Sequence, residues 1–177
     1  MLVLDDFLER TAFLMLRSAV EAPGFRWQSE HVLSPGSAEL LAAADNRQDV
    51  HGMYLRRGHG EYLSDHFGLV RPVVERLQPA ELIKVKLNRT PRRERHVEYG
   101  LHVDTRRAGA TTAILYLNSN NGYTLFEDGE RVVSVANRIV VFDAARRHTG
   151  ASCTDADYRL VLNVNLIRRP GAGDAIT

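Results

Sequence analysis

The second half of the chain is a succession of short β-type segments separated by turn signals. Four runs alternate apolar with polar residues or are rich in β-branched residues, at positions 82–88, 111–118, 138–143 and 159–166. A further segment, 123–135, predicts a hairpin that turns at Asp128-Gly129. Short strands in such close succession suggest an antiparallel sandwich or barrel, in which each strand buries one face against its neighbours.

The first half of the chain has a different pattern, which predicts helices. Apolar residues recur at helical spacing in three segments, 7–21, 37–45 and 61–77. Asp5 or Asp6 could cap the first helix, and Pro72 would kink the third or split it in two. We therefore expect helices that support the strand-rich half.

Length and composition fit one ordinary globular domain. The chain has 177 residues, of which 44% are hydrophobic and 25% are charged. A chain of this kind can bury a sizeable core without disulfides or a structural metal. The expected fold is α+β with a mainly β core, in a single domain over 1–177 that combines a helical support region (1–80) with a β core (81–167).

Charge, cysteine content and hydropathy exclude several classes of protein. The formal net charge is +1, so no global field attracts the chain to nucleic acid or to a membrane. The single cysteine, Cys153, permits no internal disulfide and indicates a reducing compartment. No segment approaches the roughly 18 consecutive apolar residues of a membrane helix, and the first residues lack the basic start of a secretory signal. We expect a cytoplasmic protein with no membrane or nucleic-acid partner.

Four residues of the strand-rich half are suited to metal and carboxylate chemistry. His102 and Asp104 stand two apart in LHVDT, where side chains of one strand share a face. His148 follows in RRHTG, and Arg159 begins the last predicted strand. Two histidines and one carboxylate form the facial triad of non-haem iron(II) oxygenases, which leaves coordination positions open. Taken singly, His102 could be a strand histidine and Asp104 a turn residue; the order and context of all four residues favour a metal site.

This context resembles a known family. The stretch from 82 to 166 is similar to the double-stranded β-helix (jelly roll) core of 2-oxoglutarate/Fe(II)-dependent dioxygenases, particularly the prolyl-4-hydroxylase-like branch. The matching text is HxD, TAILYLN (112–118), GYTLF (122–126), NRIVVFD (137–143), His148 and Arg159. The NSNNGYT segment also resembles small phage and bacterial members. The resemblance covers about half the chain and implies a double-stranded β-helix supported by the N-terminal helices.

The resemblance implies a role for each residue of the motif. His102, Asp104 and His148 would be the ligands of Fe(II). Arg159 would pair with the distal carboxylate of 2-oxoglutarate, since a guanidinium fork matches a carboxylate. Related halogenases replace the carboxylate at Asp104, so its presence favours hydroxylation or desaturation over halogenation.

Three further polar residues are candidates for the co-substrate pocket. Tyr116 occupies the family position whose hydroxyl can bond the distal carboxylate, although it could equally be a core tyrosine. Asn118 and Asn88 lie on strands that would line the cavity. Val161 stands where the family often has Ser or Thr, so Tyr116 or Thr112 would have to supply a hydroxyl.

The expected activity follows from the resemblance. It is the hydroxylation of an unactivated C–H bond in a small molecule or short peptide, with Fe(II), 2-oxoglutarate and O₂, and with release of succinate and CO₂. Two alternatives are a cupin-like metal-dependent enzyme and a non-catalytic β-sandwich binding module. Cupins usually gather histidines in an HxH stretch, which this chain lacks, and a binding module has no need of all four motif residues.

Arginines flank the ligand-bearing segments and bear on the substrate. They stand at Arg89, Arg92, Arg93, Arg95, Arg106, Arg107, Arg146 and Arg147. Ordinary solvated loops would account for them. The alternative hypothesis is a cationic rim that attracts an anionic substrate by focusing the field at a cleft.

Overall fold

The computed structural model describes residues 1–32, 46–58 and 60–169. Its helices are α1 (Arg10–Glu21), the 3₁₀ helix η1 (Phe67–Leu69) and α3 (Arg71–Leu77). Its strands are β1 (Leu2–Leu4), β2 (Gln28–His31), β3 (Arg47–Arg57), β4 (Gly60–Leu63), β5 (Pro79–Pro91), β6 (Ala110–Tyr116), β7 (Tyr123–Phe126), β8 (Arg131–Val133), β9 (Ile139–Asp143), β10 (His148–Gly150) and β11 (Tyr158–Arg168).

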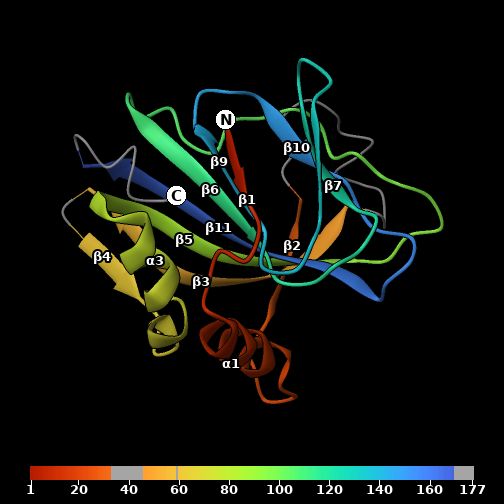
Figure 1. Ribbon diagram of the computed structural model, residues 1–177, viewed down its shortest axis with the longest axis horizontal. Helices are drawn as coiled ribbons and strands as arrows, with labels where there is room; N and C mark the ends of the chain where they lie inside the picture. The colour runs from red at the N-terminus through yellow and green to blue at the C-terminus, as the bar shows by residue number, and fades with distance from the viewer. Residues whose placement is uncertain (33–45, 59, 170–177) are drawn as a thin grey trace.

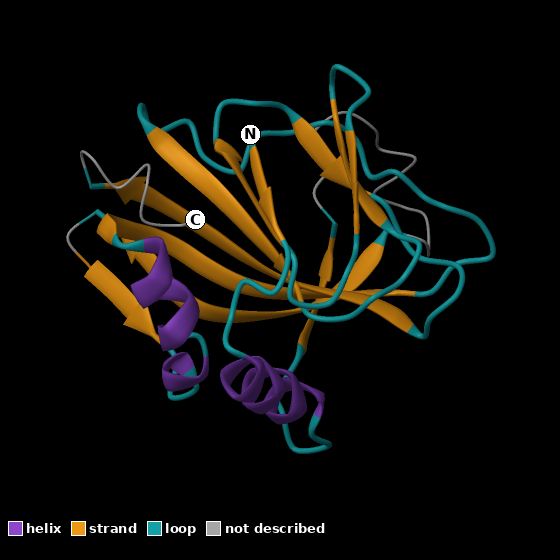
Figure 2. Cartoon of the chain, in the orientation of Figure 1, coloured by secondary structure: helices purple, strands orange, loops and turns teal. Residues whose placement is uncertain are grey.

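The strands form two antiparallel sheets. The larger sheet has eight strands in the order β1-β9-β6-β11-β5-β3-β2, with β4 paired to β3. The smaller sheet has the order β10-β7-β8. Helices α1 and α3 lie against one face of the larger sheet, and the smaller sheet lies over the other face (Figures 1 and 2). This mainly β arrangement with supporting helices confirms the predicted double-stranded β-helix.

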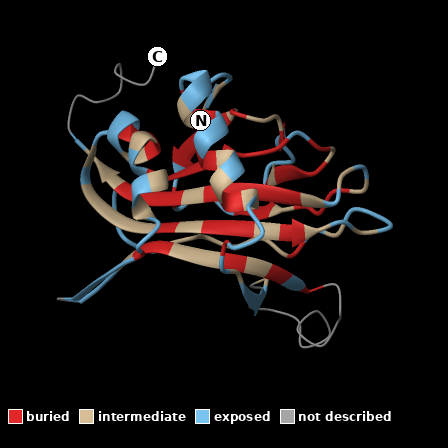
Figure 3. Ribbon diagram, turned by 90° about the horizontal axis from the view of Figure 1, so that it is seen from below, coloured by how far each residue is buried: buried red, intermediate tan, exposed pale blue. Residues whose placement is uncertain are grey.

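Alternation along the central strands produces two apolar layers. On β11, Leu160, Leu162, Val164 and Leu166 belong to the core that includes Leu16 of α1. The intervening Val161 belongs to a second cluster between the sheets, with Phe126 of β7 and Phe142 of β9. Strands of the larger sheet are buried for much of their length, whereas the outer faces of the helices are exposed (Figure 3). The period-2 pattern of the sequence thus positions both faces of the sheet.

The first predicted helix is present but starts later than expected. Helix α1 begins at Arg10, and the Glu9 carboxylate accepts hydrogen bonds from the backbone N–H groups of Thr11 and Ala12, at 2.9 and 3.2 Å. The cap is therefore Glu9, and the prediction of Asp5 or Asp6 is wrong. Asp6 has a left-handed backbone with φ of 49°, which is incompatible with a helical turn.

The third predicted helix is wrong in its first part. Residues Gly60–Leu63 form strand β4, and α3 begins only at Arg71. Pro72 therefore lies in the first turn of α3, where its missing N–H has no intrahelical partner to lose. The helical segment is split in two, as one of the two alternatives predicted, and the break between η1 and α3 lies at Val70. The helix predicted at 37–45 lies outside the described residues.

The first half of the chain is also richer in strands than predicted. Strand β3 pairs with β5 on one side and with β2 on the other, so both join the larger sheet. The region over 1–80, predicted as a helical support region, therefore contains strands β1 to β4 besides its helices. Local periodicity missed β3 because a bulge between Gly52 and Tyr54 interrupts its alternation.

Within the described residues, no helix is long and apolar enough to cross a bilayer.

Candidate active site

Long-range pairing of two segments places the two motif histidines opposite each other. His148 is the first residue of β10, and His102 forms an isolated antiparallel bridge with it. The backbone N–H of each residue donates to the carbonyl of the other, at 2.9 and 3.0 Å. HxD therefore lies in a segment that extends the smaller sheet beside β10, rather than at the end of a regular strand.

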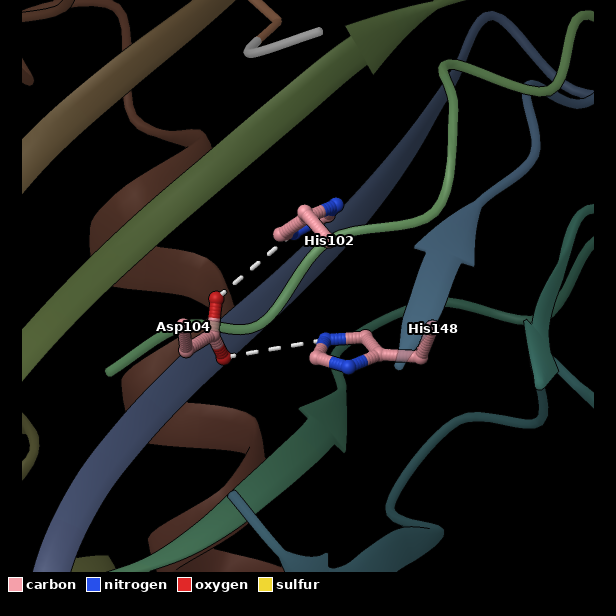
Figure 4. Close-up of side chains that lie close together, drawn as sticks. All are labelled: His102, Asp104 and His148. Atoms are coloured by element: carbon pink, nitrogen blue, oxygen red, sulfur yellow. Dashed lines mark ion pairs between the residues drawn. The ribbon is translucent and has the colours of Figure 1, made fainter. Parts of the chain in front are cut away.

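The three candidate ligands converge on one point (Figure 4). The Nε2 atom of His102 lies 3.7 Å from Oδ1 of Asp104, and Nε2 of His148 lies 3.7 Å from Oδ2 of the same carboxylate. One ligand atom from each residue lies within 4.8 Å of the other two. Two imidazole nitrogens and one carboxylate oxygen in this arrangement match the donor set of a non-haem iron site.

Backbone carbonyls orient both imidazoles. Nδ1 of His102 lies 3.2 Å from the carbonyl oxygen of Gly100, and Nδ1 of His148 lies 3.1 Å from that of Arg146. A carbonyl oxygen only accepts, so each Nδ1 carries the proton and donates. In the neutral form of each imidazole the lone pair is then on Nε2, which is the tautomer that binds a metal through that atom.

Two polar side chains of the larger sheet hold the Asp104 carboxylate. Its Oδ2 accepts from Nδ2 of Asn165 at 3.2 Å and from Oγ1 of Thr112 at 3.4 Å. Thr112 was considered as a hydroxyl for the co-substrate pocket, but its bonds to Asp104 and Asn165 assign it to the metal site. Ligand carboxylates held in this way keep their orientation.

The electrostatics of the site favour the metal-binding protonation state of Asp104 and of His148. Burial acts to raise the pKa of Asp104, but the hydrogen bond with His102 and the charges of His148 and Lys84 outweigh it, so that pKa lies well below its usual range. Burial lowers the pKa of His148. For His102, burial acts in the same direction, but the hydrogen bond with Asp104 outweighs it and raises the pKa. Asp104 is thus ionised and His148 neutral near pH 7.

Arg159 is a buried cation at the other end of the site. The residue is 5% exposed. Its Nε donates to Oγ of Ser134 at 3.0 Å, and its Nη2 donates to Oγ1 of Thr124 at 3.1 Å. Burial lowers its pKa, but a guanidinium stays charged at any physiological pH. Among the described residues no carboxylate forms an ion pair with it, and a buried charge without a counter-ion is costly. The arrangement therefore fits an anionic ligand.

Two glycines make room for the guanidinium. A Cβ atom at Gly122 would lie 2.8 Å from Cδ of Arg159, and one at Gly150 would lie 3.1 Å from its Nη1. Gly122 is the first residue of the GYTLF segment. Gly150 is the last residue of β10, two positions after His148. Their missing side chains leave the space that the Arg159 side chain occupies.

The triad and the arginine face one cavity. It has a volume of about 120 Å³, and its lining includes His102, Asp104, His148, Thr124, Asn88 and Arg159. Thr124 was not predicted as a site residue, although the Gly-x-Thr-x-Phe element pointed to it. Thr124 lines the cavity and its hydroxyl accepts from the guanidinium of Arg159. It therefore places a hydroxyl in the pocket, where position 161 has a valine instead of Ser or Thr.

The remaining predicted residues are placed differently. Asn88 lines the cavity as expected. The Tyr116 hydroxyl donates to Oγ1 of Thr124 at 2.8 Å, and its ring centroid lies 5.4 Å from the guanidinium of Arg159, so it contacts the pocket through these two residues. Asn118 lies outside the cavity lining. Its Nδ2 donates to the carbonyl of Tyr158 and its Oδ1 accepts from the N–H of Leu160, which anchors the end of β6 to β11.

Comparison with known proteins finds similarity in three dimensions. No protein-family model matches the sequence. No curated protein matches it either. Among solved structures, a prolyl-4-hydroxylase from Pseudomonas putida is 19% identical, covers 95% of this chain and 92% of its own, and gives a TM-score of 0.54. The chain has the fold of the 2-oxoglutarate/Fe(II) oxygenases.

Two other matches extend this finding. The non-heme α-ketoglutarate-dependent epimerase SnoN from nogalamycin biosynthesis is 13% identical over 98% of this chain and 83% of its own, with a TM-score of 0.62. A prolyl hydroxylase from Trichoplax adhaerens, in complex with a hypoxia inducible factor peptide fragment, is 13% identical over 94% and 82%, with a TM-score of 0.59. Because identities are this low, the likeness concerns the fold, and function has to be argued from the site.

Proposed function

We propose that residues 1–177 form a single Fe(II)- and 2-oxoglutarate-dependent dioxygenase domain. One observation carries this proposal: three metal-type ligands and the buried guanidinium of Arg159, which has no ion-pair partner among the described residues, face the same cavity. A metal site alone has no need of a buried cation, and an anion site alone has no need of the triad. Together they fit a metal-chelating 2-oxo acid whose second carboxylate lies at the arginine.

The chain's own residues would bind, orient and shield the reacting groups. His102, Asp104 and His148 would hold the iron. Arg159 and Thr124 would hold the distal carboxylate of 2-oxoglutarate by charge-assisted hydrogen bonds. When bound, iron with 2-oxoglutarate and O₂ supplies the oxidising chemistry, with release of succinate and CO₂.

Aromatic side chains would keep the metal side of the cavity dry. The ring of Phe142 lies 4.8 Å from that of His148, edge-on, and Phe126 lies 6.2 Å from the same imidazole, each distance measured between centroids. Exclusion of water strengthens the electrostatic interactions inside a site and prevents side reactions.

We infer that the reaction is the hydroxylation of an unactivated C–H bond in a small molecule or short peptide. The presence of Asp104 supports hydroxylation over halogenation. Neighbours of the same fold were solved with a small molecule, nogalamycin RO in the SnoN complex, and with a peptide, in the Trichoplax enzyme. Both substrate classes are therefore compatible with this scaffold.

Anaerobic titration followed by turnover tests the proposal. We expect a visible charge-transfer absorption that requires both Fe(II) and 2-oxoglutarate, and iron-dependent succinate release once O₂ is admitted. His102→Ala should abolish both signals. Arg159→Met should weaken 2-oxoglutarate binding by at least about tenfold, because hydrogen bonds to a charged group contribute roughly 1.5–3 kcal/mol. His96→Ala, a histidine outside the cavity lining, should retain both signals.

The same measurements separate the alternatives. Metal binding without 2-oxoglutarate turnover would identify a cupin-like enzyme. The absence of both would identify a binding module. Succinate release that survives His102→Ala would rule out the assignment of the triad.

A further inference from the structure

The chain contains only two lysines, and both lie on the site face of one strand. Of 23 basic residues counted as Lys or Arg, only Lys84 and Lys86 are lysines. They alternate on β5 with Val85 and Leu87, which belong to the core on the helix side of the sheet. Both ammonium side chains therefore lie on the face that carries the candidate active site.

The lysines stand between two depressions of that face. The cavity of the triad and a second depression of about 480 Å³ both include Lys84 and Lys86 in their lining. The second depression lies over β2, β3, β4 and β5, and its lining includes Gln28, Glu30, Val50, Gly52 and Tyr62. Gly52 pairs in register with Lys86 and presents no side chain beside it. The two lysines thus border both depressions, the one at the triad and the one over β2 to β5.

Strand register places Lys84 next to the metal site. Lys84 pairs with Asn165, the residue that donates to Asp104, and neighbouring strands are about 4.8 Å apart. Arg159 pairs with Thr90, four residues beyond Lys86, which corresponds to about 13 Å along the strand. The lysines and Arg159 are therefore two separate cationic sites.

The counter-ions of the two lysines are incomplete. Nζ of Lys86 lies 3.3 Å from the carboxylate of Glu30, which is half exposed. No ion pair joins Lys84 to another described residue, and Asp104, the carboxylate whose charge it feels most, belongs to the triad. An incoming anion could replace Glu30 at low cost, because the displaced carboxylate would return to water.

Several of the flanking arginines, in contrast, are paired at the surface. Arg89 pairs with Asp49, Arg107 with Glu81, Arg146 with Asp128 and Glu130, and Arg147 with Glu127. None of these arginines lines either depression. Four of the eight flanking arginines are therefore neutralised at the surface. Among the described residues, the Lys and Arg side chains that line the cavity of the triad are Lys84, Lys86 and Arg159.

We propose that Lys84 and Lys86 bind the anionic group, a carboxylate or a phosphate, of a small-molecule substrate whose oxidised carbon lies at the triad. This inference rests on the proposed function, because the triad defines where the reaction occurs. Three observations support it: the shared lining, the register beside Asn165, and the lack of an ion pair between Lys84 and any residue that the structure describes. The anion site is distinct from the one at Arg159, so the substrate and 2-oxoglutarate can bind together.

Amine-selective labelling tests the anion site without any need for turnover. Acetylation by an N-hydroxysuccinimide ester can modify only these two lysines and the N-terminal amine. With the protein loaded with Fe(II) and 2-oxoglutarate under anaerobic conditions, inorganic phosphate or benzoate should slow acetylation of both lysines at least threefold. Benzamide and sodium chloride of equal ionic strength should not, and the N-terminal amine reports general effects. The anion that protects better identifies the headgroup; protection by neither would overturn the proposal.

Turnover with matched variants tests the role in substrate binding. In a screen of carboxylates, phosphate monoesters and their neutral analogues, anionic compounds should stimulate succinate release. Lys84→Met and Lys86→Met should each raise the KM of such a substrate about tenfold to a hundredfold, the usual effect of losing a charge-assisted hydrogen bond. The KM of its carboxamide should not change, and Lys84→Arg should restore most of the affinity.

Arg106→Gln is the matched control, because it removes one positive charge outside both depressions. An equal rise of KM in this variant, or a wild-type KM in both lysine variants, would overturn the proposal. If wild-type protein releases no succinate, the proposed function fails, while the labelling result still decides whether the lysines bind anions.

Discussion

At Gly122 the structure has no room for a side chain. A Cβ atom would lie 2.8 Å from Cδ of Arg159, 2.8 Å from Oδ1 of Asn120 and 3.0 Å from the carbonyl oxygen of Ala151. The last is backbone and Asn120 is itself hydrogen bonded to the N–H of Gly122, so the arginine is the neighbour that must move. The position of one buried cation thus depends on one missing methyl group.

We expect Gly122→Ala to impair 2-oxoglutarate binding while sparing the metal site. Overpacking of this kind costs roughly 1–3 kcal/mol, so the Kd for 2-oxoglutarate should rise by about five- to a hundredfold. The Kd for Fe(II) should stay at its wild-type value, because the triad lies on other segments. Anaerobic titration of each ligand measures both effects.

Gly24→Ala provides the control for this prediction. A Cβ atom at Gly24 would have no heavy atom within 4 Å, so both Kd values should be unchanged. If Gly122→Ala also binds 2-oxoglutarate with wild-type affinity, Arg159 is not the residue that holds the distal carboxylate.

Among the elements, the turn before β9 fixes the chain that leads into α1. Asn137 has a left-handed backbone with φ of 65°. Its side-chain amide donates to the carbonyl of Leu8 at 2.8 Å and accepts from the N–H of Leu8 at 2.9 Å. Its own carbonyl accepts from the N–H of Phe7 at 2.8 Å. One asparagine therefore ties the N-terminal segment to the larger sheet.

Two substitutions separate the contributions of Asn137. Asn137→Gly keeps the left-handed backbone but loses two buried hydrogen bonds, which should lower the free energy of unfolding by about 2 kcal/mol. Asn137→Ala adds left-handed strain and should lower it by about 1 kcal/mol more. Urea denaturation measures both values. If the alanine variant is as stable as the glycine variant, the backbone conformation contributes nothing to the effect.

At the scale of the whole molecule, the site joins three parts of the chain. His102 and Asp104 lie in the segment before β6, His148 lies on β10 of the smaller sheet, and Arg159 lies on β11 of the larger one. Ligands that contact all three parts can bind only when both sheets are in place. Binding should therefore stabilise the native fold against unfolding.

We expect metal and co-substrate together to raise the melting temperature by about 5–10 °C. A ligand at 100 times its Kd adds about 2.7 kcal/mol, and each kcal/mol shifts a domain of this size by about 2–4 °C. Mn(II) can replace Fe(II) in the melting experiment so that no turnover occurs. A chelator should reverse the shift, and His148→Ala should show none. A shift that persists in His148→Ala would place the metal elsewhere.

Much of the β core could be predicted from local sequence. The alternation in 82–88 and 159–166 predicted strands that the structure contains as β5 and β11, and Asp128-Gly129 lies at the predicted hairpin turn between β7 and β8. Such patterns are visible in one sequence because side chains alternate with period 2 in any strand. Strands β2 and β3 could not be predicted in this way, because β2 is exposed and forms only by pairing with β3, and a bulge interrupts the alternation of β3.

The roles of individual polar residues depended on distant partners. Tyr116 and Asn118 lie on or beside β6 as expected, but Thr124 and the backbone of β11 take up their hydrogen-bonding groups. Thr112 faces Asp104 instead of Arg159 for the same reason. A hydroxyl or amide forms hydrogen bonds with the groups that the fold places within about 3 Å of it. The spacing of residues in the sequence does not reveal which groups those are.

The sequence by itself determined which residue types were available for chemistry, namely the HxD pair, a later histidine and an arginine at the start of the last strand. Only the tertiary structure decided that they share one cavity. The decisive contact is the backbone bridge between His102 and His148. These residues are far apart in the sequence, so the contact exists only when the sheet forms. Lys84 and Lys86 show the same division between sequence and structure. The sequence predicted that they lie on one face of a strand, whereas the register of β5 against β11 placed that strand beside the metal ligands.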